Sequence, residues 1–174
     1  MSSYEIGYIS GFAVVIIISM LCALFFKRKS PKPVYDERQT LCRFKAYKNA
    51  FWVLMCYVAV TCVVFGPLDI AFADITTLGF IGICLAGVVL AVTCIFNDCY
   101  YGINQQPKRY MRLLIAIAVA NIMIFINNMR DGGSIITDGM LNYKSIHLIG
   151  TVMITIIIIA SVIKQRLVRE ESDS

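Results

Sequence analysis

The chain has 174 residues, of which 59% are hydrophobic and only 16% are charged, and its mean hydropathy is +0.74. Soluble domains carry about 25% charged residues, and a soluble fold of this length could not hide so much apolar surface behind so little charge. The composition therefore argues against the soluble globular and disordered classes. It predicts an integral membrane protein with a single domain over residues 1–174.

Five stretches are long and apolar enough to cross a membrane, which takes about 20 residues for a hydrocarbon core of ~30 Å. They are residues 6–26, 50–72, 75–96, 111–128 and 146–164. None shows the alternation of a membrane barrel, so we expect an all-α polytopic protein with five transmembrane helices in an up-down bundle. Spans two to five would form a four-helix bundle with span one alongside. In span one the positive charge follows the apolar run, which predicts an uncleaved anchor.

Lysine and arginine are distributed very unevenly between the two sides of these spans. Fourteen of the 16 basic residues fall in the loop after span one, the loop after span three or the tail, whereas only Arg130 and Lys144 fall on the other side. Cytoplasmic loops carry this excess, so we expect the N-terminus outside and the C-terminus inside a plasma membrane, the inner membrane if the protein is bacterial.

The predicted spans carry few polar side chains at membrane depth. No ionisable residue lies near the middle of a span, which argues against an ion-coupled transporter or a charge-lined channel. Asn121 is the most central strongly polar residue, either as a ligand or gating contact or, as we favour, as an interhelical hydrogen bond. Gly82 and Ala86 place two small residues on one face of span three and permit close packing. Ala116 and Ala120 have the same spacing in span four, and the short loop between the two spans favours packing of these faces within one chain.

The seven cysteines fall within spans or inner loops, so structural disulfides are not expected and the thiols are interpreted as small packing groups. No spacing of cysteine and histidine indicates a metal site, and no phosphate-binding or nucleophile motif occurs. We therefore expect no cofactor, no metal, no catalytic residue and no enzymatic activity.

The inner loops hold the most distinctive polar sequence. Asp36 and Glu37 suit a helix N-terminus, and the segment of about 36–50 predicts a basic amphipathic helix that continues into span two. Asp98 lies where span three leaves the bilayer, with Arg38, Arg43 or Lys48 as its expected partner. The candidates for a lock between the loops, or for contact with a partner, are Asp36, Glu37, Arg38, Arg43, Lys48, Asn97, Asp98 and Tyr101.

Two motifs carry a resemblance to a known group. Asp36-Glu37-Arg38-Gln39, with the stretch from Lys45 into a span, is one, and Asn97-Asp98-Cys99-Tyr100-Tyr101 is the other. Together they resemble a group of small multi-span proteins of Firmicutes-type bacteria that carry DERQ-like and NDAY-like motifs on the cytoplasmic side, although Cys99 stands where that group has alanine. The resemblance covers about residues 36–110 and implies a bacterial plasma-membrane protein. It implies no particular activity.

These observations predict a non-enzymatic membrane protein, an accessory or regulatory component that assembles through its cytoplasmic loops. The expected partners are the bilayer with its anionic lipids, further copies of the chain or another membrane protein, and no nucleic acid. The alternative is a small oligomeric transporter or channel for a small solute, with a path lined by Asn121, Thr93, Thr151 and Thr155.

Overall fold

A computed structural model describes residue 17 and residues 33–130 and 134–173. The chain divides into two compact units, Met1–Val34 and Tyr35–Ser174, and everything below concerns the second. The predicted first span, residues 6–26, lies outside the described residues except for a single position.

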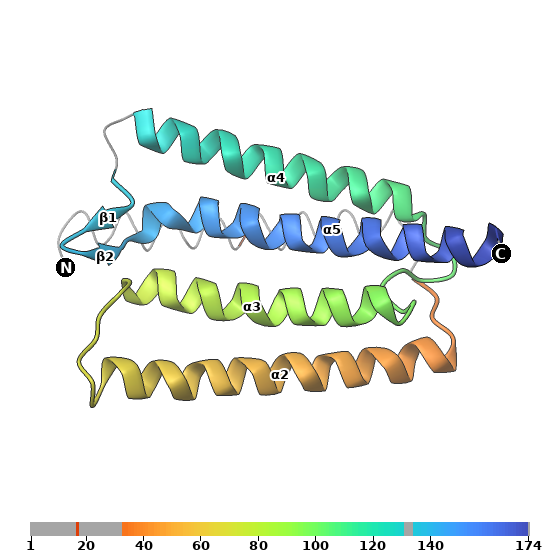
Figure 1. Cartoon of the computed structure of the whole chain (residues 1–174), viewed down its shortest axis with the longest axis horizontal. Helices are drawn as coiled ribbons and strands as arrows, with labels where there is room; N and C mark the ends of the chain where they lie inside the picture. Colours follow the sequence, from red (N-terminus) through yellow and green to blue (C-terminus); the bar gives the residue numbers. More distant parts are fainter. Residues whose placement is uncertain (1–16, 18–32, 131–133, 174) are drawn as a thin grey trace. The chain divides into compact units, whose positions relative to one another are not determined.

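Four long helices make up most of this unit: α2 (Glu37–Phe65), α3 (Ile75–Phe96), α4 (Pro107–Arg130) and α5 (Ile146–Asp173) (Figure 1). All four are long and apolar enough to cross a membrane. The mainly helical fold and these four candidate spans are therefore confirmed. The fifth span and the orientation stay predictions.

Helix α2 has clear signals at both ends. Asp36 caps its start, because the Asp36 carboxylate accepts a hydrogen bond from the Gln39 backbone N–H at 2.6 Å. At its end a Cβ on Gly66 would lie 2.7 Å from the Cys62 carbonyl oxygen, and Pro67 follows with no N–H to donate. Asp69 then adopts a left-handed backbone with φ 51°. The span predicted over 50–72 therefore ends at Phe65, and residues 66–74 form a loop.

The other helices begin where their sequences favour it. Asp74 caps α3 by accepting from the Thr77 N–H at 2.6 Å, and α3 keeps the predicted bounds 75–96. Helix α4 begins at Pro107, a residue suited to the first helical turn, and so extends past the predicted start at 111. Helix α5 continues beyond the predicted end at 164 into a charged final segment.

The helices lie in a row in the order α4, α5, α3, α2, with chain direction alternating along the sequence (Figure 1). Helices α3 and α4 are thus not the close neighbours that their short loop predicted. Gly82 instead meets α2, where a Cβ would lie 2.7 Å from the Tyr57 ring, while Ala86 is half-buried on the same helix. Ala116 and Ala120 on α4 are exposed. The expected packing of these two small-residue faces is therefore wrong, because the large Tyr57 ring occupies the space that Gly82 leaves.

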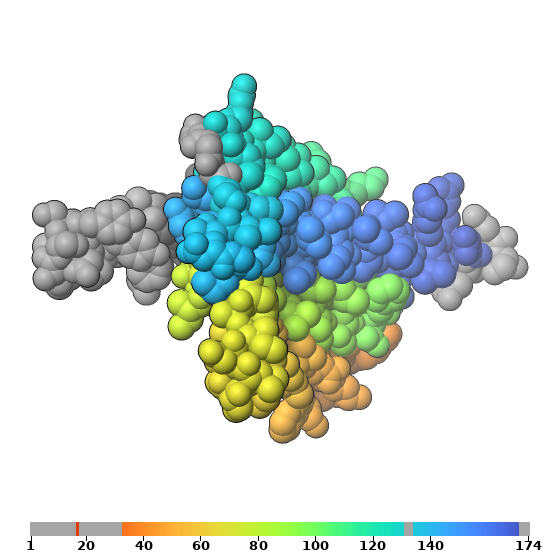
Figure 2. Space-filling model, turned by 60° about the vertical axis from the view of Figure 1, so that its left-hand side comes forward, coloured from red at the N-terminus to blue at the C-terminus, as the bar shows by residue number. Residues whose placement is uncertain are grey.

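One end of the row carries a short hairpin. Strands β1 (Ile136–Thr137) and β2 (Met140–Leu141) pair antiparallel through Asp138 and Gly139, both with positive φ, as a tight Asp-Gly hairpin turn requires. Leu141 also exchanges backbone hydrogen bonds with the loop between α2 and α3, at Phe72 and Asp74. Figure 2 shows this hairpin against that loop. A 3₁₀ turn, η1 (Tyr143–Ser145), then leads into α5. We call this the hairpin end.

Candidate functional site at the basic end of the helices

The opposite end, which we call the basic end, contains the start of α2, the loop between α3 and α4, and the last turns of α5 (Figure 1). All basic residues of the four helices lie toward it except Arg130. The predicted site residues of both inner loops also lie here, so the structure brings the two loops together.

The motif Asn97-Asp98-Cys99 forms the C-terminal cap of α3. The Cys99 N–H donates to the Cys94 carbonyl at 2.9 Å and the Asp98 N–H to the Ile95 carbonyl at 3.3 Å, while Asp98 adopts φ 58°. These are the two bonds of a Schellman motif, with aspartate at the left-handed position where glycine is most common. The Asn97 side chain also donates to the Thr93 carbonyl at 2.8 Å. This cap fixes the backbone at Asp98 and Cys99, whose carbonyls accept hydrogen bonds from α2.

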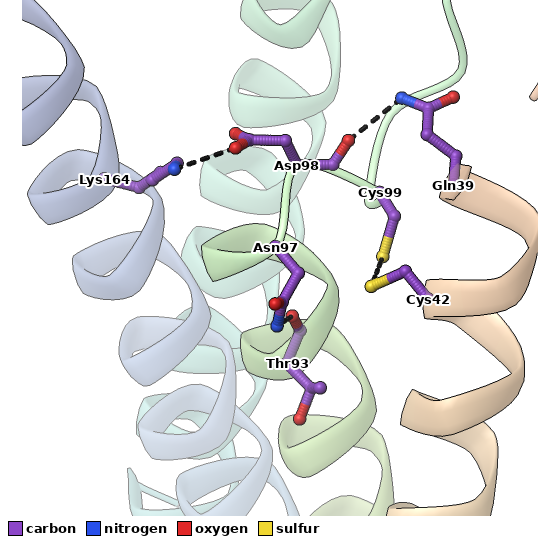
Figure 3. A network of polar contacts seen from close by, with 7 residues as sticks. All are labelled: Gln39, Cys42, Thr93, Asn97, Asp98, Cys99 and Lys164. Atoms are coloured by element: carbon purple, nitrogen blue, oxygen red, sulfur yellow. Dashed lines mark hydrogen bonds and ion pairs between the residues drawn. The ribbon is translucent and has the colours of Figure 1, made fainter. Parts of the chain in front are cut away.

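Helix α2 binds those carbonyls through two side chains. The Gln39 Nε2 group donates to the Asp98 carbonyl at 2.9 Å and, in a longer contact of 3.4 Å, to the Tyr101 carbonyl. Arg43 Nη1 donates to the Cys99 carbonyl at 3.4 Å (Figure 3 shows the Gln39 contact with Asp98). The two inner loops are therefore joined through backbone acceptors.

Helix α5 binds the same loop through charge. Lys164 Nζ lies 2.9 Å from an Asp98 carboxylate oxygen (Figure 3). The expected pairing of Asp98 with Arg38, Arg43 or Lys48 is therefore wrong: Asp98 points toward α5, which lies beside α3, and not toward α2. The Asp98 side chain is 58% exposed, so this ion pair contributes at most about 1 kcal/mol to stability. It mainly orients the ends of α3 and α5.

A group of tyrosines surrounds Arg43. The Arg43 guanidinium lies 4.1 Å from the centre of the Tyr35 ring, a cation–π contact. Tyr100 and Tyr101 meet edge to face with ring centres 4.8 Å apart, and burial raises the pKa of both phenols. A cavity of about 200 Å³ opens between these groups, lined by Tyr35, Arg43, Tyr47, Leu90, Cys94, Tyr100, Gln105 and Tyr110.

Three cysteines pack at the centre of the basic end. Cys94 and Cys99 are buried and form, with Ala46, the main cluster of buried apolar residues in the described chain, and Cys42 packs against them from α2. The sulfur atoms of Cys42 and Cys99 are 2.7 Å apart (Figure 3). Burial raises the pKa of the Cys99 thiol, and contact with Cys42 raises it further. A Schellman motif is usually accompanied by an apolar contact between the third helical residue before the cap and the second residue after it. In the α3 cap these two residues are Cys94 and Cys99.

The remaining candidates serve local structure or stay exposed. Asp36 caps α2, while Glu37, Arg38 and Lys48 are exposed, and the structure assigns these three no side-chain hydrogen bond or ion pair among the described residues. Asn121 joins two helices: its carbonyl oxygen lies 3.1 Å from His147 Nδ1 on α5, and its amide donates to the Ile117 carbonyl on α4.

Sequence reasoning missed four contributors, Gln39, Cys42, Cys99 and Lys164, as members of this site. Gln39 and Cys99 stand inside the two motifs singled out above, which was the available signal. Lys164 was visible only as the charge that ends span five, and no sequence pattern indicates that α5 lies beside α3.

Comparisons of the chain with models of protein families, with curated proteins and with solved structures find no match. Within the described residues no group of three or more His, Cys, Asp or Glu side chains is arranged to hold a metal ion. The interpretation of the basic end therefore depends on its own geometry.

Proposed function

We propose that the protein is a non-enzymatic component of a bacterial plasma membrane that assembles with another membrane protein, or with further copies of itself, through its basic end. In this proposal the basic end faces the cytoplasm. The observation that carries the proposal is the loop of residues 97–102, which α2 and α5 hold from two sides through Gln39, Arg43 and Lys164. A loop fixed in this way presents one surface to a partner and loses little conformational entropy on binding.

The surroundings of this loop favour a partner that carries negative charge. The same end of the helices carries basic side chains that remain exposed, and Ile103, which directly follows the loop, is 67% exposed. The basic side chains are Arg38, Lys45, Lys48, Lys108, Arg109 and Arg112. Each such charge contributes about 1 kcal/mol of attraction near an anionic leaflet. Acidic segments of a partner protein offer the same chemistry and would compete with lipid headgroups.

The long helices offer less polar chemistry. Between Lys48 and the end of α2, throughout α3, and between Arg112 and Arg130 in α4, the sequence contains no Asp, Glu, Lys or Arg. Charged groups inside a membrane usually mark ion or proton paths. In this chain the charged residues lie at the ends of the helices instead, which supports a function at the membrane surface.

The alternative of a solute path receives no specific support from the geometry. A cavity of about 390 Å³ between α3, α4 and α5 is lined by Asn121, but neither Thr93, Thr151 nor Thr155 lines it, and most of its walls are apolar. The Thr151 and Thr155 hydroxyls donate to carbonyls of their own helix. A flux assay in liposomes would still distinguish this alternative.

The proposal is tested by gentle extraction of the tagged full-length protein from its native membrane, followed by quantitative mass spectrometry. We expect a stoichiometric partner, or a homo-oligomer, that is lost when Lys108, Arg109 and Arg112 are all replaced by glutamine. Lys144→Gln, which removes one positive charge at the hairpin end, is the control for position and should retain the partner. Equal recovery from both variants would contradict an assembly site at the basic end.

A further inference from the structure

The cysteines of the described chain are not spread at random along its helices. Three of the six meet at the basic end, whereas Cys56, Cys62 and Cys84 lie elsewhere on α2 and α3. The sulfur atoms of Cys42 and Cys99 approach to 2.7 Å. This separation exceeds a disulfide bond of about 2.05 Å but is shorter than ordinary van der Waals contact between two sulfur atoms. A small shift of either side chain would bring the two within bonding distance.

We propose that Cys42 and Cys99 form a dithiol site that a small-molecule disulfide oxidises to an intramolecular disulfide. In the first step the Cys42 sulfur attacks one sulfur of the oxidant R–S–S–R, forms a mixed disulfide and releases one R–SH. In the second step the Cys99 sulfur attacks the Cys42 sulfur of that mixed disulfide, and the second R–SH leaves. The protein loses two hydrogens and two electrons, and the oxidant gains both as two thiols.

Burial sets the order of the two steps. Cys42 is half-buried near the exposed start of α2, whereas Cys99 is fully buried. The external oxidant can therefore reach Cys42 first, and Cys99 is held in place to resolve the mixed disulfide. The Arg43 guanidinium donates a hydrogen bond to the Cys99 carbonyl and so helps to hold the loop that carries Cys99 against α2.

The bond would have a defined structural effect. Cys42 lies one turn after Gln39 on α2, and Cys99 directly follows Asp98, so the disulfide would reinforce covalently the contact that Gln39 makes with the Asp98 carbonyl. The reduced protein can separate α2 from the loop, and the oxidised protein cannot. The inference concerns the chemistry of the two thiols and does not depend on the proposed function.

The test uses the full-length protein in lipid nanodiscs with 2,2′-dithiodipyridine as the oxidant. One variant keeps Cys42 and Cys99 and has alanine at the other five cysteines. The matched control keeps Cys56 and Cys62, both exposed on α2, and has alanine at the rest. Intact-mass spectrometry should show the first protein lighter by two hydrogens and free of thiopyridyl groups, and dithiothreitol should reverse the change. The control should carry thiopyridyl adducts or stay unmodified.

Peptide mapping of the oxidised wild-type protein provides a second measurement that needs no variant to fold. We expect the Cys42–Cys99 linked peptide to exceed every other linked cysteine pair by at least tenfold. Stable thiopyridyl adducts on Cys42, a dominant Cys42–Cys94 link, or free thiols at both Cys42 and Cys99 after the other cysteines have reacted would each overturn the proposal.

Discussion

Replacement of Gly82 with alanine should weaken the packing of α2 on α3. The new Cβ would lie 2.7 and 2.8 Å from two carbons of the Tyr57 ring and 3.4 Å from a methyl carbon of Leu54. Carbon atoms in good contact are about 3.5–4.0 Å apart, so the ring must move by most of an ångström. The ring is not free to do so, because the Tyr57 hydroxyl donates to the Leu78 carbonyl at 2.8 Å.

The expected cost combines two effects. Overpacking of this kind costs typically about 1–3 kcal/mol, and loss of the Tyr57 hydrogen bond costs about 1 kcal/mol more. The gain in helix propensity from glycine to alanine offsets up to about 1 kcal/mol. We therefore expect the free energy of unfolding to fall by about 1–3 kcal/mol.

Two further glycines of α3 serve as matched controls. A Cβ on Gly79 or Gly87 would meet nothing within 4 Å, so their alanine variants should be neutral or slightly stabilising. Reversible unfolding in mixed micelles with increasing dodecyl sulfate measures all three variants. In a Tyr57→Ala background the cost of Gly82→Ala should vanish, because the obstructing ring is gone. Equal stability of the Gly82 and Gly79 variants would refute this description of the interface.

The other predictions concern the caps and loops, and the same unfolding assay measures each. Gln39→Ala should lower the free energy of unfolding by about 1–2 kcal/mol, because two hydrogen bonds to fixed carbonyls are lost. The neighbouring variant Arg38→Ala should stay within about 0.5 kcal/mol of the wild type, as is usual for exposed sites. A larger effect of Arg38→Ala than of Gln39→Ala would contradict these contacts. Asp98→Ala should lower the free energy of unfolding by about 1–2 kcal/mol, since alanine tolerates the left-handed backbone poorly. Asp98→Gly should be at least as stable as the wild type. The reverse order of stability would show that the charge of Asp98 outweighs backbone strain. Although burial opposes ionisation of Asp74, the hydrogen bond from the Thr77 backbone N–H and others like it hold the pKa of this carboxyl below its ordinary 3.8. The ionised Asp74 carboxylate therefore stabilises the fold above pH 3.8, and this contribution is lost as the pH falls through the lower pKa of the folded state. Asp74→Asn should reduce the loss of stability that the protein shows at acidic pH. An unchanged loss of stability at acidic pH would contradict the assignment.

The sequence predicts helix existence here better than helix ends. Helix α3 keeps its predicted bounds because Asp74 supplies an N-cap directly before an uninterrupted apolar run. The end of α2 was predicted too late because residues 70–73 are largely apolar, and hydropathy alone does not register the backbone break at Gly66 and Pro67. Helix α4 begins before the predicted span at 111, because residues 107–110 are polar enough to leave a membrane yet remain helical.

In the candidate site, likewise, the sequence indicates the unusual motifs but not the contacts that they make. The two inner-loop motifs could be found from sequence, since Asp98 and its neighbours are unusual polar residues at the end of a span. The partner of Asp98 could not, because charge counting offers several basic residues and only the helix order places Lys164 of α5 beside it. The roles of Gln39 and Arg43 were also hidden, because both bind backbone carbonyls, which every residue carries.

Site-specific photo-crosslinking in native membranes tests the central claim most directly. A benzoylphenylalanine in place of Ile103, in the loop at the basic end, is compared with one in place of Ile136, in the hairpin at the opposite end; both side chains are well exposed, by 67% and 53%. Assembly through the basic end predicts a discrete cross-linked protein band from position 103 and none from position 136. A band from position 136 alone, or no protein adduct at position 103, would contradict it.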